Sequence, residues 1–376
     1  MQRRRRDWKN FDITLVVCFL LLSVVSLLMV ASATRARSTH DYSVVKKQAT
    51  WVATGLVLII GLAFTPYEQW LSHERWLYVV NLGLLLAVLI FGRSALGAQR
   101  WLKVGPVVIQ PSELAKVITV LSFGAYLSKS DAPPRSWKEI FGTLLYILPS
   151  ALLIFKQPDL GTSLVLPVVA VGMLYMAGAP GTKLATMICG ALALVGGLIW
   201  GHFRYGIPLP FHDYQLKRVA VLFDPSLDPL GAGYHIRQSI IALGSGKLVG
   251  KGIFMGDQSQ LKFLPEASTD FIYAVIGEEL GFLGTMGILL VYLVLLLRML
   301  KIASQAKDTY GRLITAGMMS MLAFHVLVNA GMTMGIMPVV GIPLPFVSAG
   351  GSSFLANSIA LGIVESVYVH RQKIPF

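Results

Sequence analysis

The chain has 376 residues, of which 55% are hydrophobic and only 14% are charged, and its mean hydropathy is +0.67. These values exclude an ordinary soluble domain and indicate a membrane protein that crosses the bilayer many times. The net charge of +13 is scattered between the apolar runs. Anionic lipid headgroups or a phosphate-bearing substrate therefore suit it better as partners than nucleic acid does.

The N-terminus carries arginines at 3–6, followed by an apolar run at 13–33. No small-residue cleavage site ends a short apolar region, so we interpret this run as a membrane anchor rather than a removed signal peptide. The two cysteines, Cys18 and Cys189, both lie inside apolar runs. Their positions favour neither a disulfide framework nor a metal site built from cysteines.

Ten apolar runs are long enough to cross a bilayer. They lie roughly at 13–33, 49–66, 76–93, 111–128, 140–156, 160–178, 182–203, 271–297, 311–333 and 345–368. The sequence therefore predicts an all-α integral membrane protein with ten transmembrane helices, in which 1–376 forms a single polytopic membrane domain. If the first arginines are inside, sixteen Lys and Arg fall in inner segments and eight in short outer ones. By the positive-inside rule, both termini are expected to be cytoplasmic.

The 204–270 segment is the one long connection, and this topology makes it a large extracytoplasmic loop. Within it, 212–225 and 233–246 alternate polar or basic residues with apolar ones at roughly helical spacing. This pattern predicts short helices that lie in the membrane interface rather than a separate folded domain.

Polar motifs mark the starts of the four later even-numbered helices, which all begin at the outer face. The motifs are QPSE at 110–113, QPDLGT at 157–162, STD at 268–270 and SAGGSS at 348–353. Helix N-termini present unpaired N–H groups and a positive dipole end, which suit phosphate. Pro, Ser and Asp are also common helix starters. That explains each motif singly, but not why the inner helix starts lack them, so we expect one shared outer site.

Asp270 stands where the polar stretch 262–270 meets the apolar run that follows. A carboxylate at the boundary with lipid is costly, so it is either a solvated helix cap or a functional group. Glu278 and Glu279 follow about two turns deeper. Because they are adjacent, at most one faces a cavity well, and a buried interhelical contact is the favoured role.

Two nucleotide or hydrolase signals fail on inspection. The stretch 244–247, GSGK, resembles a phosphate loop, but Leu248 replaces the required Ser or Thr and no strand is expected before it. The sequence also contains no Gly-x-Ser-x-Gly elbow. A nucleotide-driven pump and a serine hydrolase are therefore disfavoured.

Six motifs, taken in chain order, resemble the SEDS family, the membrane proteins of shape, elongation, division and sporulation. They are GAQRWL at 97–102, QPSELAK at 110–116, QPDLGT at 157–162, DPLGAGYHIRQS at 228–239, QSQLKFLPEASTDFIYAVIGEELG at 258–281 and PLPFVSAGGSS at 343–353. The residue sequence at 244–252 and 258–266 is more similar to the elongation branch, RodA, than to the division branch, FtsW.

The resemblance implies ten transmembrane helices in a bacterial cytoplasmic (inner) membrane and a peptidoglycan glycosyltransferase. Such an enzyme polymerises lipid II at the outer face during cell elongation, in cell-wall synthesis. It also implies a class B penicillin-binding protein as the transpeptidase partner. A lipid II flippase and a non-catalytic scaffold of the elongation complex are the alternatives. The concentration of motifs at the outer face favours the enzyme, because a flippase needs polar residues that continue inward.

Asp270 matches the family's catalytic aspartate and is the expected general base. Pyrophosphate is a good leaving group, so a general acid is dispensable, whereas the acceptor hydroxyl needs a base. The sequence leaves the pKa of Asp270 open, because a helix start lowers it and burial raises it. A divalent cation, Mg²⁺ or Mn²⁺, is compatible with pyrophosphate chemistry. No ligand cluster establishes one, so no metal site is predicted.

Substrate binding is assigned to polar residues of the same motifs and of the long loop. Glu113 and Lys116 are three residues apart and are expected to pair on one helix face; a purely structural ion pair is the alternative. For Asp159 and Thr162 the alternative is helix capping, and for Trp101 it is an interfacial anchor. For the basic residues of the long loop the alternative is solvated charge. The full set is Arg100, Trp101, Gln110, Ser112, Glu113, Lys116, Asp159, Thr162, Arg218, His235, Arg237, Gln238, Lys262, Glu266, Ser348 and Ser352.

Overall fold

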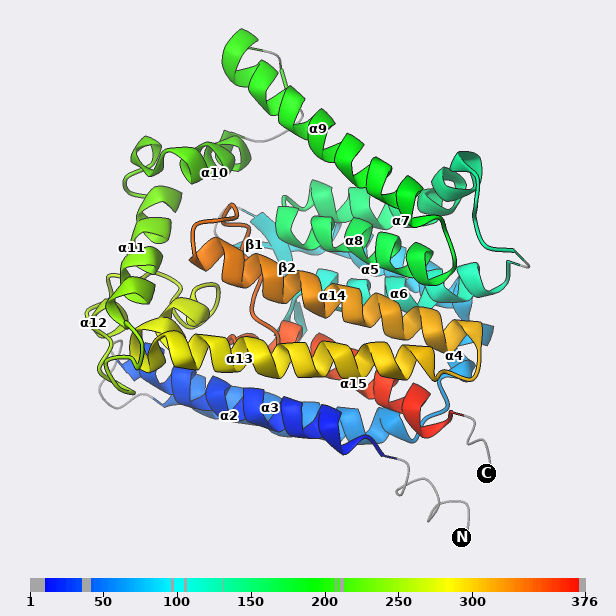
Figure 1. The fold of residues 1–376 in the computed structure, drawn as a ribbon, viewed down its shortest axis with the longest axis horizontal. Helices are drawn as coiled ribbons and strands as arrows, with labels where there is room; N and C mark the ends of the chain where they lie inside the picture. The colour runs from blue at the N-terminus through cyan, green and yellow to red at the C-terminus, as the bar shows by residue number, and fades with distance from the viewer. Residues whose placement is uncertain are drawn as a thin grey trace.

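The computed structural model describes residues 11–35, 42–95, 98–104, 107–130, 132–206, 208–209 and 213–371, which fold mainly into helices (Figure 1). A helix covers most of each of the ten apolar runs. These helices are α2 (Ile13–Arg35), α3 (Ser43–Ala63), α5 (Glu74–Phe91), α6 (Pro111–Ser128), α7 (Trp137–Lys156), α8 (Leu160–Met176), α9 (Gly181–Tyr205), α13 (Ile272–Ser304), α14 (Thr309–Thr333) and α15 (Gly351–Val369). Within the described ranges, eight are long and apolar enough to cross a membrane; α6 and α8 are not among them, and α8 is only 17 residues long.

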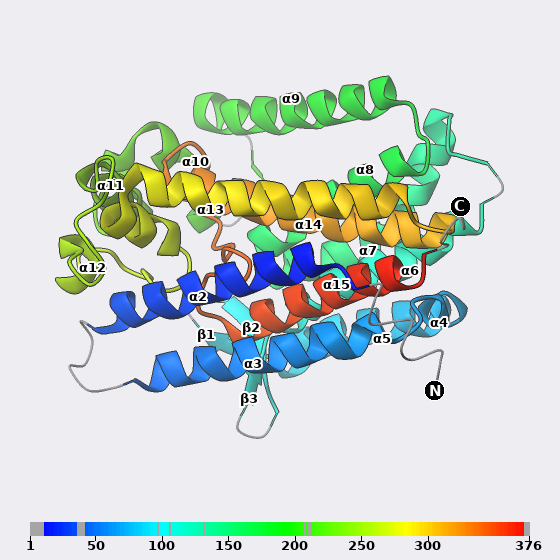
Figure 2. The ribbon, with the colours of Figure 1, turned by 60° about the horizontal axis from the view of Figure 1, so that its bottom comes forward.

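The helices pack around α14 and α15, which are largely buried, whereas α9 is largely exposed. Helix α15 lies along α3, and α14 packs against both α8 and α13. Helix α2 covers α13 on the other side, and α9 stands apart from the bundle in both views (Figures 1 and 2). The polar motifs that precede α6, α8, α13 and α15 are therefore carried by helices of one packed body.

Short-range chemistry explains where several helices begin or bend. Helix α7 starts at a capping box in which Ser136 and Glu139 bond each other's backbone N–H groups, and Asp308 caps α14 by accepting a bond from Gly311 N. Helix α13 bends at Gly281, whose φ of 66° favours glycine. Beyond the bend, Phe282 N donates to Lys247 O at 2.8 Å.

The all-α prediction is wrong for the stretch before α6. Three short strands, β1 (Arg93–Ala95), β2 (Ala98–Val104) and β3 (Val107–Ile109), form an antiparallel sheet in the order β1-β2-β3. Arg93 pairs with Trp101, and Leu102 pairs with Ile109. The β-branched residues of 104–109 favour extended backbone. Pairing with β2 then satisfies the backbone hydrogen-bonding groups of this extended stretch. The pairing also brings residues 100 and 101 toward the start of α6.

The long loop contains both predicted helices, α10 (Asp213–Phe223) and α11 (Ala232–Ser245). The 3₁₀ turn η1 (Pro225–Leu227) and the short helices α12 (Asp257–Gln260) and α4 (Glu68–Ser72) were not predicted. Their few residues give too little periodicity to detect. The arginines at 3–6 and the chain after Arg371, on which the predicted orientation partly depends, lie outside the described residues.

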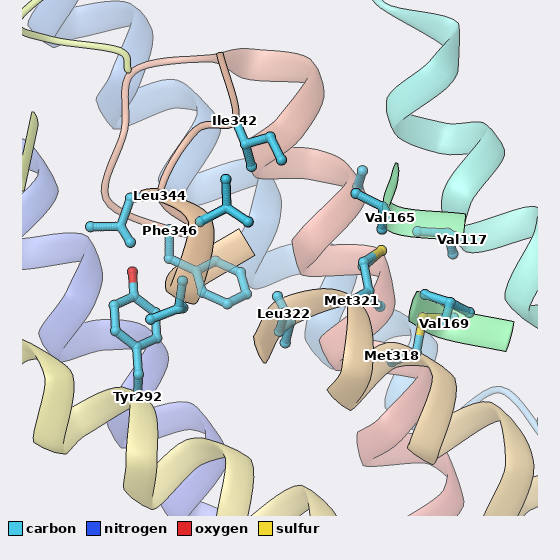
Figure 3. Packing of buried hydrophobic residues seen from close by; sticks show 14 of the residues in the cluster. Val117, Val165, Val169, Tyr292, Met318, Met321, Leu322, Ile342, Leu344 and Phe346 are labelled. Carbon is cyan, nitrogen blue, oxygen red and sulfur yellow. The ribbon is translucent and has the colours of Figure 1, made fainter. Parts of the chain in front are cut away.

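An irregular segment between α14 and α15 is anchored in the apolar core. Ile342, Leu344 and Phe346 are buried and point from this segment into the bundle (Figure 3). Tyr292 OH of α13 donates to Pro345 O at 2.5 Å. The segment is therefore fixed at the start of α15 by apolar burial as well as by hydrogen bonds.

Candidate active site

The four predicted helix starts meet in space. Gln110, just before α6, donates from its backbone N to Ser352 Oγ of α15 at 3.0 Å. Its side-chain Nε2 donates to Asp159 Oδ2, at the start of α8, also at 3.0 Å. Ser348 Oγ donates to Thr269 O, just before α13, at 2.6 Å. The convergence of these motifs, which the sequence predicted, is thus confirmed.

Asp159 forms the first centre of this site and is surrounded by donors. Its carboxylate accepts bonds from Thr162 N at 3.3 Å, from Thr162 Oγ1 at 2.9 Å and from Ser112 Oγ at 3.4 Å. Arg100 Nη1 lies 3.7 Å from Asp159 Oδ1, and Arg100 also donates to Pro158 O. Asp159 is buried, so this carboxylate caps α8 and fixes Arg100.

Close packing connects this centre with the segment before α15. A Cβ at Gly161 would lie 2.8 Å from Val340 O and 2.8 Å from Ile342 Cγ1. Such distances would force a backbone shift, so glycine is needed for the start of α8 to approach this closely.

Asp270 forms the second centre, and its surroundings differ. Its side chain is half-buried, and a Cβ at Gly341 would lie 3.2 Å from Asp270 Oδ2. Its backbone carbonyl accepts a bond from Asn329 Nδ2 of α14 at 2.9 Å. Within the described part of the chain, no hydrogen-bond donor reaches its carboxylate oxygens. The carboxylate is thus held by its backbone and keeps its acceptor capacity.

Burial raises the pKa of Asp270 to about 6, and the negative charge of Glu266 acts in the same direction. The positive charges of Arg218 and Arg100 oppose the shift. Burial therefore outweighs the two arginine charges, and the pKa of Asp270, which the sequence left open, is raised. A carboxyl group with this pKa is ionised at neutral pH and is a stronger base than an ordinary aspartate.

A pocket of about 240 Å³ lies beside this centre. It is lined by Lys217, Arg218, Asp228, Gly231, Ala232, His235 and Val339. The His235 ring is 5.8 Å from that of Phe271, the residue after Asp270. Burial lowers the pKa of His235, Glu266 opposes this, and Arg218 adds to it. The imidazole is therefore neutral at pH 7, and the positive charge at the pocket comes from Lys217 and Arg218.

Lys217 was not among the predicted substrate-binding residues, although it precedes Arg218 directly on α10. A pair of adjacent basic residues in the middle of an amphipathic helix was the available signal. From sequence alone, a basic residue in the loop is equally consistent with a binding group and with a solvated charge. Only the fold places Lys217 at a pocket.

The predicted pairing of Glu113 and Lys116 is confirmed. Lys116 Nζ lies 2.9 Å from Glu113 Oε1 and 3.0 Å from His325 Nε2 of α14. Exposure is 3% for Glu113, 2% for Lys116 and 0% for His325, so the three groups form a buried polar centre beneath the helix starts. His325 was not predicted; a lone histidine in an apolar run was the only signal. Substrate contact by Glu113 or Lys116 stays a prediction.

Other predicted site residues lie farther from these contacts. Trp101 is half-buried on β2, Gln238 is half-buried on α11, and Arg237 and Lys262 are exposed. Glu266 accepts a bond from Thr269 Oγ1 at 3.1 Å and affects both Asp270 and His235 electrostatically. Among the hydrogen bonds of the described residues, none joins Trp101, Arg237, Gln238 or Lys262 to the two aspartate centres.

Glu278 and Glu279 are both buried and bind α12 or the loop that precedes it. Glu278 Oε1 accepts bonds from Lys251 Nζ at 2.8 Å and from Gln258 N at 3.0 Å. Glu279 accepts bonds from Phe254 N at 3.2 Å and from Ser32 Oγ of α2. The favoured interhelical role therefore holds for both: Glu279 bonds Ser32 of α2, and Glu278 bonds Gln258 of α12 as well as Lys251 of the preceding loop.

The donor set around the two centres was also compared with the needs of a metal ion. Among the residues that the structure describes, no three His, Cys, Asp or Glu side chains gather closely enough to hold one. We therefore assign no step of the chemistry below to a metal.

A family model and individual relatives of known sequence indicate the same family for this chain. A family model described as "Cell cycle protein", covering FtsW, RodA and SpoVE, matches residues 12–373. Peptidoglycan glycosyltransferase MrdB of Escherichia coli K12 is 41% identical over 369 residues, covering 97% of this chain and 95% of that protein. Peptidoglycan glycosyltransferase RodA of Treponema pallidum is 33% identical, covering 97% of this chain and 99% of that protein.

Solved structures agree with these relatives. A chain of a complex described as "Structural coordination of polymerization and crosslinking by a peptidoglycan synthase complex" superposes with a TM-score of 0.78. It is 29% identical, and the match covers 95% of this chain and 97% of that one. The crystal structure of Thermus thermophilus RodA has a TM-score of 0.69 and 28% identity, covering 96% of this chain and 98% of that one.

Proposed function

This chain belongs to the FtsW, RodA and SpoVE family, and from that premise we propose that it is a RodA-type peptidoglycan glycosyltransferase with Asp270 as its general base. The substrate is lipid II, a disaccharide-peptide linked through pyrophosphate to a polyprenyl chain. The observation that carries the catalytic assignment is the contrast in surroundings: Asp270 has a raised pKa and an uncommitted carboxylate beside a cationic pocket.

The reaction needs one proton acceptor and stabilisation of one leaving group. Asp270 takes the proton of the acceptor sugar's hydroxyl as its oxygen forms a bond to the anomeric carbon of the donor. The bond between that carbon and the pyrophosphate oxygen breaks, and polyprenyl pyrophosphate leaves with the electron pair. Lys217 and Arg218 offset the charge that develops on the leaving pyrophosphate. Neutral His235 lines the same pocket as a hydrogen-bonding group.

The same proposal fixes the side of the membrane on which the reaction occurs. Ten helices cross a bacterial cytoplasmic membrane, both termini are cytoplasmic, and the starts of α6, α8, α13 and α15 lie at the outer face. Helices α10 and α11 then lie in the outer interface, where their cationic pocket meets the lipid-linked pyrophosphate. The positive-inside distribution of Lys and Arg supports this orientation.

Purified protein with labelled lipid II tests this function directly. The wild type should form glycan polymer, and Asp270→Asn should lower the rate about 10²–10⁴-fold, because the amide keeps the size of the side chain but cannot accept the proton. Thermal unfolding in detergent should stay close to that of the wild type, since Asp270 borders water. Near-wild-type polymerisation by a folded Asp270→Asn variant would refute the base assignment. Transfer of lipid II across vesicles without polymer would instead favour a flippase.

A class B penicillin-binding protein is the proposed partner and supplies the transpeptidase. The synthase complex among the solved structures, whose description joins polymerisation and crosslinking, supports this pairing. The 204–270 loop is small for fixing an acceptor glycan alone, so the polymerisation rate should rise when the partner is bound. Equal rates from the protein alone and from the complex, at saturating lipid II, would contradict this role.

A further inference from the structure

We propose that Asn329 is a positioning residue for Asp270, holding it at the segment between α14 and α15 through its side-chain amide. This inference rests on the proposed function, in which Asp270 is the general base. Asn329 is not among the residues that line the pocket, and within the described residues its amide bonds go to backbone carbonyls rather than to the Asp270 carboxylate. It therefore acts through the backbone of Asp270.

The contact is bridging, and it is made by one fully buried side chain. Asn329 Nδ2 donates to Asp270 O at 2.9 Å and to Ile342 O at 2.7 Å. Asp270 belongs to the chain before α13, and Ile342 belongs to the irregular segment before α15. Gly341, next to Ile342, lies against the Asp270 carboxylate. One amide group therefore joins the two chain segments that border the carboxylate.

The neighbouring carbonyls show why Asn329 matters for residue 270 itself. Ser268 O accepts a bond from Ala349 N at 2.8 Å, and Thr269 O accepts one from Ser348 Oγ at 2.6 Å. These two bonds come from the start of α15. The third carbonyl in the row, that of Asp270, is held from α14 by Asn329. Loss of the amide frees the peptide group that follows Asp270, while Ser268 and Thr269 stay fixed. The orientation of that peptide group helps to set the direction of the Asp270 side chain.

The second acceptor of the Asn329 amide nitrogen, Ile342 O, adds a constraint. The segment around Ile342 is held by its apolar side chains and by Tyr292 (Figure 3). Asn329 thus connects Asp270 to a part of the molecule that has little freedom to move. A general base must lie about 2.6–3.2 Å from the proton-bearing atom, and a misplacement of about 1 Å can cost on the order of 10²-fold in rate.

Asn81 on α5 provides a matched control. It is also fully buried, and its Nδ2 also donates two bonds, to Thr119 Oγ1 at 2.9 Å and to Ser150 Oγ at 3.2 Å. Its acceptors belong to α6 and α7 rather than to the site. Replacing either asparagine with leucine keeps a similar volume and removes the donors, so the two variants share the structural cost of losing a buried amide.

The experiment compares Asn329→Leu with Asn81→Leu in purified full-length protein with labelled lipid II. Asn329→Leu should lower kcat about 10–100-fold with KM within about threefold, because binding groups are untouched and only the base is misplaced. Asn81→Leu should keep kcat within about threefold at a similar loss of thermal stability. Equal kcat values for the two variants would overturn the inference. Asn329→Ala, which also removes the donors, carries the same expectation if the leucine variant fails to fold.

A double variant separates this inference from the function on which it rests. In the Asp270→Asn background, adding Asn329→Leu should change the residual rate by less than about threefold, since a misplaced carboxylate no longer matters. A further 10–100-fold loss there would show that Asn329 acts independently of Asp270 and would overturn the positioning role. An active Asp270→Asn single variant would instead refute the proposed base, whatever Asn329 does.

Discussion

Asp159 and Asp270 each stand at or just before the start of an apolar helix, yet their carboxylates have different surroundings. The Asp159 carboxylate accepts bonds from Thr162, Ser112 and Gln110 and pairs with Arg100. That of Asp270 lies beside Gly341 and is constrained through its backbone. A carboxylate whose lone pairs are occupied stabilises structure, whereas one that keeps them free in a half-buried site can take a proton.

The buried centre beneath the site should show the largest structural effect. Lys116→Met leaves the Glu113 carboxylate buried without its cation, which should cost about 3–5 kcal/mol of unfolding free energy. Adding Glu113→Leu removes the unpaired charge and should recover most of that loss. Thermal unfolding of both variants in detergent measures this. If the double variant is as unstable as Lys116→Met, the ion pair is not what stabilises this centre.

Asp159→Ala should reveal the structural aspartate. It removes the α8 cap and the partner of Arg100, and the expected loss is about 2–4 kcal/mol, reduced because Arg100 is partly exposed. Asp270→Asn is the comparison and should cost less than about 1 kcal/mol, because it breaks no bond to its carboxylate. Calorimetry of the two variants in the same detergent decides between them. A larger stability loss in Asp270→Asn would reverse the roles assigned to the two residues.

The pH dependence gives the smallest effect and the sharpest test of the Asp270 environment. The base acts when ionised, and burial raises its pKa in the free protein to about 6. The value of kcat/KM should therefore be level above about pH 6 and fall about tenfold per pH unit below it. Initial rates between pH 5 and 8 measure this limb. Glu266→Gln removes a charge that raises this pKa, so it should move the limb to lower pH. A limb near pH 4 in the wild type would show that burial does not control Asp270.

The sequence predicted the helices well because a membrane-length apolar run is a local signal. All ten runs became helices, as did both amphipathic stretches of the long loop. The sheet at 93–109 was missed because strand pairing depends on residues that meet only after folding, and each strand is at most seven residues long. The short helices α4 and α12 were missed for the same lack of length.

The candidate site was predicted in part, and the omissions have a common cause. Residues in polar motifs at helix starts were found, including Gln110, Asp159 and Ser352, which the structure brings together. Asn329 and His325 are single polar residues inside an apolar helix, and a sequence does not say what such residues face. Their partners come from segments that lie far away in the chain.

The sequence by itself determined the class of the protein, the positions of its helices and the four polar helix-start motifs, because hydrophobic length and helix-start chemistry are local properties. Helix-start chemistry alone did not separate Asp159 from Asp270, since each accompanies a Ser or Thr near the start of an apolar run; only the family resemblance singled out Asp270 as the expected base. The tertiary structure alone shows their different surroundings, with Arg100 and Gln110 on one carboxylate and Gly341 beside the other. The pKa and role of a carboxylate follow from the burial and donors around it, and distant segments supply both.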